Sequence, residues 1–122
     1  MAVERNITTA DDWYIGEDKT LPVTIYQSNG TTAQDVTGWA ISFMLKKRAT
    51  DADVAAKVTK TTVSGIALTT PASGLITVSI ADTDTDGLAA GSYRYEIKRT
   101  DAGFETVLTS GACVLRQAVH RT

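Results

Sequence analysis

The sequence is poor in the residues that build disulfide frameworks and metal sites. Its 122 residues include one cysteine, Cys113, and one histidine, His120. A single cysteine cannot form an internal disulfide, so the fold has to be stable without that cross-link. One cysteine and one histidine are also too few ligands for a zinc site. We therefore expect no cofactor, and we interpret Cys113 as a small apolar residue of a strand rather than as the partner of His120 in a catalytic pair.

Long apolar runs and an excess of basic charge are also missing. No run of apolar residues approaches the length of a membrane span, and the stretch MAVERNITTADDW lacks the apolar segment of a secretory signal. The formal net charge is −2, whereas a nucleic-acid-binding domain usually carries a basic face. The sequence therefore predicts neither a membrane partner nor a nucleic-acid partner.

Short stretches of alternating apolar and polar residues, rich in β-branched and aromatic side chains, make up most of the chain. The stretches WAISFMLKK (39–47) and SYRYEIKRT (92–100) alternate clearly. Their two-residue period predicts a buried face that includes the candidate core residues Trp39, Ile41, Phe43 and Tyr95.

Further strands are expected over residues 21–27, 75–80 and 104–117, the last one bent or bulged at Gly111. Residues 50–63 allow two interpretations, a helical turn capped by Asp51 or a loop that leads into a strand. About seven short strands separated by turn signals are typical of an antiparallel, immunoglobulin-like β-sandwich, here without a disulfide.

The expected domain organisation is simple. Residues 1–18 form an N-terminal arm, 19–116 the sandwich and 117–122 a C-terminal tail. The arm carries Trp13 and Tyr14, and two interpretations stay open. The two rings are docking anchors for another protein, or they belong to a first strand and are buried in the sandwich.

The stretch GLAAGSYRYEI, with ADTDTD just before it, contains a half-match to an ion site. Asp82, Asp84 and Asp86 followed by Gly87 have the spacing that opens a calcium-binding loop. The match then fails, because the twelfth position is Tyr93 rather than a bidentate glutamate. A phosphate loop is excluded by the strand pattern that follows the glycines, since an anion site of this type needs the start of a helix.

A structural corner explains the same stretch better. Asp82 is expected to cap a short helical turn, Leu88 to fill the core and Gly91 to let the chain turn back into the sheet. Tyr93 then begins a strand, and in a tyrosine corner the hydroxyl of such a residue forms a hydrogen bond with the backbone a few residues upstream. We favour the corner and keep calcium as the alternative for the three aspartates.

The basic run Lys46-Lys47-Arg48 ends a predicted strand. It is interpreted as a solvated turn that guards the sheet against edge pairing. A contact for an acidic partner is the alternative.

Three short motifs follow one another along the sequence. They are Gly16-Glu17-Asp18, Asp35-Val36-Thr37-Gly38 and Leu88-Ala89-Ala90-Gly91-Ser92-Tyr93. This order resembles the immunoglobulin-like structural domains of tailed bacteriophages, in particular the N-terminal module of the baseplate upper protein family, over about residues 13–116.

The resemblance implies a non-enzymatic building block of a virion, assembled in the host cytoplasm. Its partners would be other virion proteins, and it would be present in several copies within a symmetric assembly. Tail, baseplate, neck and capsid decoration all remain open as its place.

Two other classes of function remain to be weighed. A glycan-binding sandwich would need exposed coplanar rings, for which the sequence offers Trp13, Tyr14 and Tyr26. An enzyme is disfavoured, because no arrangement of nucleophile and base is visible in the sequence.

Overall fold

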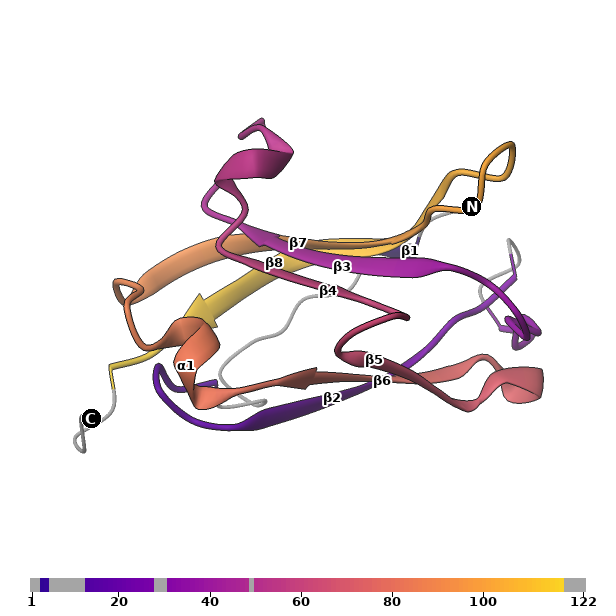
Figure 1. The fold of residues 1–122 in the computed structure, drawn as a ribbon, viewed down its shortest axis with the longest axis horizontal. Coiled ribbons are helices and arrows are strands. Elements are labelled where there is room, and N and C mark those ends of the chain that lie inside the picture. The colour runs from indigo at the N-terminus through magenta and orange to yellow at the C-terminus, as the bar shows by residue number, and fades with distance from the viewer. Residues whose placement is uncertain (1–2, 5–12, 28–30, 49, 118–122) are drawn as a thin grey trace.

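The computed structural model describes residues 3–4, 13–27, 31–48 and 50–117. Two sheets pack face to face, and the strands of both run along the long axis of the molecule (Figure 1). The strands are β1 (Val3–Glu4), β2 (Lys19–Thr24), β3 (Ile41–Lys46), β4 (Val58–Thr61), β5 (Ile66–Thr70), β6 (Leu75–Ile80), β7 (Gly91–Arg99) and β8 (Thr106–Leu115). Within the described residues the helices are short, namely η2 (Asp53–Ala55), η3 (Pro71–Ser73) and α1 (Asp82–Thr85).

The larger sheet has the strand order β1-β8-β7-β3-β4 and the smaller one the order β2-β6-β5. All pairings are antiparallel except that of β1, which runs parallel to β8. The strands thus divide between the two sheets in the immunoglobulin-like manner. The predicted fold class, a seven-stranded immunoglobulin-like sandwich without a disulfide, is confirmed, and β1 is an addition to it.

The core lies between the sheets and follows the predicted alternation. Ile41, Phe43 and Leu45 of β3 are buried, and the alternate positions Ser42 and Met44 are only half-buried. Across the same sheet, Phe43 stacks on Tyr95 with ring centroids 6.1 Å apart. Trp39 departs from the prediction, because it precedes β3 and is only half-buried, packing against the core from its edge.

The N-terminal arm contributes to the sandwich itself. Trp13 is fully buried and Ile15 nearly so. The backbone of this segment bonds to the end of the last strand, because Arg116 donates its N–H to Trp13 O (3.0 Å) and Ile15 donates to Arg116 O (2.9 Å). Of the two interpretations of Trp13, burial in the sandwich is therefore correct and the docking anchor is wrong, although Trp13 itself belongs to no strand. Tyr14, which bridges Arg116, is half-buried.

The last strand is bulged, but not where the sequence predicts. Gly111 pairs regularly with Tyr95. The register shifts instead beside Ile97 and Lys98, which pair with Thr109 and Val107 and leave Leu108 as the extra residue. A bulge places two neighbouring side chains on one face, which explains why both Leu108 and Thr109 are buried.

Residues 50–63 combine both expected forms, a helical turn and then a strand. The helix η2 leads to β4, but its N-cap position is Ala52, which offers no side-chain cap. The carboxylate of Asp51 instead accepts a hydrogen bond from the backbone N–H of Arg48 at 3.1 Å. Asp51 therefore closes the turn after β3, and its predicted role as the helix cap is wrong.

Candidate functional site

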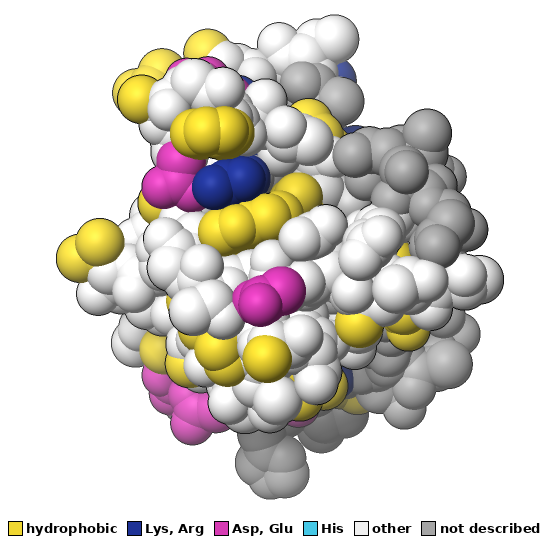
Figure 2. Space-filling model, turned by 90° about the vertical axis from the view of Figure 1, so that its right-hand side faces the viewer, with side chains coloured by type: hydrophobic (Ala, Val, Ile, Leu, Met, Phe, Trp, Pro, Cys, Tyr) yellow, Lys and Arg dark blue, Asp and Glu magenta, His cyan; other side chains and the backbone are white. Residues whose placement is uncertain are grey.

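Three connections meet at one end of the sandwich, which we call the loop end. They are the described residues 25–27 and 31–40 between β2 and β3, the turn of residues 70–75 between β5 and β6, and the hairpin of residues 99–106 between β7 and β8. All three lie on the right in Figure 1. Figure 2 shows this end directly, with a basic side chain held between hydrophobic ones near the middle of the face.

The first two connections are locked together by close backbone contact. Ile25 donates its N–H to Gly74 O at 2.8 Å, and Val36 donates to Pro71 O at 2.9 Å. Gly74 has a φ of +72°, and a Cβ atom at this position would lie 2.5 Å from Ile25 O and 2.7 Å from Gln34 O. Only glycine therefore permits this approach.

The motif Asp35-Val36-Thr37-Gly38 places Trp39 at the loop end. The Asp35 carboxylate accepts hydrogen bonds from the Thr37 hydroxyl (2.6 Å) and the Thr37 N–H (2.9 Å), and these two bonds hold the pKa of Asp35 below its usual range. Val36 is fully buried, and Trp39 donates its N–H to Val36 O at 3.0 Å. The turn is thus anchored in the core on one side and presents the Trp39 ring on the other.

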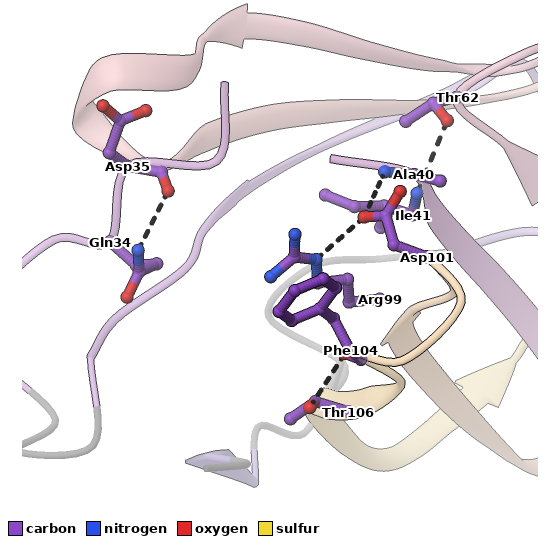
Figure 3. Close-up of polar contacts among 9 residues, drawn as sticks. All are labelled: Gln34, Asp35, Ala40, Ile41, Thr62, Arg99, Asp101, Phe104 and Thr106. Carbon is purple, nitrogen blue, oxygen red and sulfur yellow. Dashed lines mark hydrogen bonds and ion pairs between the residues drawn. The ribbon is translucent and has the colours of Figure 1, made fainter. Parts of the chain in front are cut away.

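The β7–β8 hairpin is closed by the turn Asp101-Ala102-Gly103. Gly103 takes a φ of +84°, and Phe104 donates its N–H to Asp101 O at 2.9 Å. The Asp101 carboxylate accepts hydrogen bonds from Arg99 Nε (2.8 Å) and from the Ala40 N–H (3.0 Å), as Figure 3 shows. The Arg99 bond and then the Ala40 bond lower the pKa of Asp101, so the carboxylate joins the hairpin to the start of β3.

Arg99 lies between two aromatic rings. Its Cζ is 4.0 Å from the ring centroid of Trp39 and 4.7 Å from that of Phe104. Both distances fall within the range of cation–π attraction. Phe104 remains 61% exposed, so this stack of Trp39, Arg99 and Phe104, which we call the aromatic–arginine stack, lies at the surface.

A shallow hollow of about 270 Å³ opens beside the stack. It is lined by Ile25, Tyr26, Gln27, Gln34, Trp39, Arg99, Thr106 and Leu108. Tyr26 is 40% exposed. The loop end therefore combines exposed aromatic surface, an arginine and several neutral polar groups, a composition that resembles protein-binding hot spots.

The predicted structural corner is present at the opposite end of the sandwich. The Tyr93 hydroxyl donates a hydrogen bond to Ala89 O at 2.7 Å, and burial raises the pKa of Tyr93. Gly91 has a φ of +144°, and Leu88 packs against the core. Asp82 differs from its predicted role, because it is the first residue of α1 and its N–H is bound by the Asp18 carboxylate at 2.8 Å.

Two of the three aspartates of the calcium alternative, Asp82 and Asp84, hold other parts of the chain. Asp84 accepts the Ala81 N–H at 2.7 Å and pairs with Lys60 at 2.8 Å. Burial raises the pKa of Asp84, but these two bonds outweigh burial and lower it. Asp82 accepts the Thr83 N–H at 2.8 Å. Across the part of the chain that the structure describes, no three acidic, histidine or cysteine side chains gather as metal ligands.

The basic run has local contacts. Lys46 pairs with Asp53 at 2.7 Å, and Lys47 Nζ lies 4.6 Å from the centroid of the Tyr93 ring. The Lys46 bond lowers the pKa of Asp53. Arg48 is exposed at the end of the molecule opposite the loop end. The structure thus gives Lys46 and Lys47 intramolecular roles, and the alternative of an acidic partner stays a prediction.

Cys113 lies in the core, and burial raises its pKa to about 12. The thiol is therefore protonated at neutral pH, as expected of a packing residue rather than of a nucleophile. His120, the other member of that catalytic pair, lies outside the described residues. Among the helices that are described, none is long and apolar enough to cross a membrane.

The sequence analysis missed Arg99, Asp101 and Phe104 as site residues. A usable signal was present, because the turn Asp101-Ala102-Gly103 has an arginine two residues before it and a phenylalanine directly after it. A large apolar side chain directly after a polar turn is usually exposed unless another element covers it.

The chain matches no model of a known protein family and no curated protein. Its candidate site therefore has to be judged by its own geometry and chemistry.

Proposed function

We propose that this chain is a non-enzymatic structural component of a bacteriophage virion that acts through protein–protein contacts in a symmetric assembly. The observation that carries the proposal is the aromatic–arginine stack at the loop end, with Phe104 61% exposed. Tryptophan, tyrosine and arginine dominate the binding energy of protein interfaces. Trp39, Arg99 and Tyr26 gather here beside a single hollow.

The virion setting is supported by the ordered motifs that resemble the phage baseplate upper protein module. Each motif has a defined task in the fold. Asp18 binds the first N–H of α1, Asp35 closes the turn that presents Trp39, and Tyr93 bonds to Ala89 O. The shared motifs thus maintain the sandwich, which leaves its loops and edges to make contacts.

The sheet edges supply a second means of contact. β4 ends the larger sheet, and β2 and β5 end the smaller one. β2 contains Pro22, which has no N–H to donate and so suits the edge position that the sequence predicted. β5 carries no proline, and an open edge of this kind can accept a strand from a neighbour.

The glycan-binding alternative loses its expected surface. It required Trp13, Tyr14 and Tyr26 as exposed, coplanar rings, but Trp13 is 0% exposed. The three rings therefore cannot form one platform, and we do not propose this function.

The proposal is tested by quantitative mass spectrometry of purified virions, counting this chain against the major capsid protein. A count comparable to the capsid protein indicates a decorating or cementing role, and a count that matches one small ring indicates the neck, tail or baseplate. Absence of the chain from the particle would refute the proposal.

A further inference from the structure

We propose that the loop end binds a short segment of another virion protein that carries one aspartate or glutamate, and that this carboxylate sits on the two terminal nitrogens of Arg99 beside Trp39 and Phe104. This inference rests on the proposed function and names the surface and the partner chemistry for it. Four features of the described residues carry it: the fixed orientation of Arg99, its remaining donors, the hollow beside it and the local charge.

The guanidinium of Arg99 is oriented before any partner arrives. Its Nε is bound by Asp101 at 2.8 Å, and the rings of Trp39 and Phe104 contact its two faces at 4.0 and 4.7 Å. Asp101 is itself fixed by the Ala40 N–H. An arginine held in this way loses little side-chain entropy when it forms a further hydrogen bond.

The remaining donors of Arg99 match a carboxylate. A guanidinium has five N–H groups, and among the described residues Asp101 is the acceptor that holds one of them. Figure 3 shows the two terminal nitrogens pointing away from Asp101. Two parallel N–H groups of an arginine form a bidentate pair with a carboxylate, so the free side of Arg99 is suited to an aspartate or glutamate.

The hollow next to Arg99 can receive the rest of such a segment. Ile25 and Leu108 supply apolar lining, while Gln27, Gln34 and Thr106 supply neutral polar groups. The exposed rings of Tyr26 and Phe104 can cover the contact. Water is thereby excluded from the ion pair, which is the setting in which interface residues contribute most to affinity.

Local charge favours a single carboxylate over a polyanion. Asp101 already neutralises much of the Arg99 charge, and Asp35 is exposed on a neighbouring loop of the same end. Nucleic acid carries a charge on every phosphate and needs several cations. One carboxylate on a short peptide segment requires one properly oriented guanidinium, and the loop end provides it.

The first experiment measures incorporation of variants into virions. Phage that carry Arg99→Gln, Arg99→Lys or Phe104→Ala in this chain are purified, and the copy number per particle is compared with that of wild type. We expect about a tenfold loss for Arg99→Gln and an intermediate loss for Arg99→Lys, which keeps the charge but not the paired donors. Arg48→Gln is the matched control, because it removes an exposed arginine at the opposite end.

Folding of each variant is checked separately, because the stack also supports the hairpin. Phe104→Ala removes a side chain that is 61% exposed, so its thermal transition should stay close to that of wild type while incorporation falls. Absence of the wild-type chain from particles would refute the proposed function itself. If the wild-type chain is present in particles and neither Arg99→Gln nor Phe104→Ala changes its copy number, the docking inference alone is refuted.

The second experiment identifies the contact. A photoreactive benzoylphenylalanine replaces Phe104 in phage-borne protein, and the cross-linked peptide is sequenced. We expect the cross-linked peptide to come from another virion protein and to contain an aspartate or glutamate. Changing that acidic residue to arginine should restore incorporation of the Arg99→Glu variant. A cross-link to nucleic acid, to a second copy of this chain or to a segment without a carboxylate would overturn the inference.

Discussion

The carboxylate of Asp101 accepts a hydrogen bond from the backbone N–H of Ala40 at 3.0 Å, across 61 residues of sequence. The same oxygen accepts Arg99 Nε at 2.8 Å. One side chain of the β7–β8 hairpin therefore fixes both the start of β3 and the arginine of the candidate site.

Asp101→Asn should lower the free energy of unfolding at neutral pH, and the difference between variant and wild type should shrink as the pH falls. The Arg99 and Ala40 bonds hold the pKa of Asp101 below its usual value of 3.8. A carboxyl group with a lowered pKa stabilises the fold fully above that usual value and loses this contribution as the pH falls through the lowered pKa. Urea titrations of both proteins from pH 7 to about pH 2 measure this. Glu105→Gln, in a long and exposed pair with Lys98, is the control and should change little.

Tyr93→Phe should destabilise the protein by about 1 to 2 kcal/mol, since it removes the hydroxyl that binds Ala89 O at 2.7 Å. The ring of Tyr93 is buried and stays in place in the phenylalanine variant, so the change tests the hydrogen bond rather than the packing of the core. Chemical denaturation gives the difference in the free energy of unfolding. Tyr26→Phe, at an exposed ring, should leave the free energy of unfolding unchanged. Equal effects of the two substitutions would contradict the role of the Tyr93 hydroxyl in the corner.

Gly74→Ala should be far more harmful than Gly103→Ala. Both glycines have positive φ, +72° and +84°, so each change carries the left-handed penalty of about 1–2 kcal/mol. At Gly74 the added Cβ would also lie 2.5 Å from Ile25 O, whereas at Gly103 nothing lies within 4 Å. The melting temperatures of the two variants measure the difference. Similar values would show that the turn at Gly74 does not lie close to the backbone of Ile25 and Gln34.

Trp13→Ala should cost about 3–5 kcal/mol, the usual range for a large aromatic side chain of a core. Tyr14→Ala, at the half-buried neighbour, should cost clearly less. Urea denaturation of both variants distinguishes a core role of the arm from a docking role. A stable Trp13→Ala protein with impaired virion incorporation would favour docking instead.

Cys113 should not react with a disulfide reagent such as DTNB in the native protein at pH 8. Burial raises the pKa of its thiol to about 12, so very little thiolate forms. The reaction should become fast only when urea unfolds the chain, with the same midpoint as the loss of the β signal in circular dichroism. Rapid labelling of the folded protein would show that the last strand opens locally.

Much of the fold could be read from the sequence because a strand is a local, periodic pattern. The alternation through Ile41, Phe43 and Leu45 is visible in the sequence and appears as buried positions of β3. Turn chemistry is equally local, as in Asp101-Ala102-Gly103, whose closing bond joins residues three apart. The corner at Tyr93 also lies within a few residues, since its acceptor is Ala89.

The errors concern features that depend on pairing partners. The bulge was predicted at Gly111 from residue type, but a bulge is a property of two strands, and the register shift lies beside Leu108. Whether Trp13 is buried or exposed depends on Arg116, about a hundred residues away in the chain, which bonds to its backbone. The local sequence pattern predicts neither the register of β7 against β8 nor the contact between Trp13 and Arg116.

The sequence by itself determined most strands, the turns and the lack of an internal disulfide, because each follows from composition or short-range periodicity. The tertiary structure alone decided that Trp39, Arg99 and Phe104 meet, since the strands that end at the loop end bring residues 39 and 99 within contact distance. A surface of this kind is made by long-range strand pairing, and its chemistry exists only once β3 and β7 lie side by side in the larger sheet.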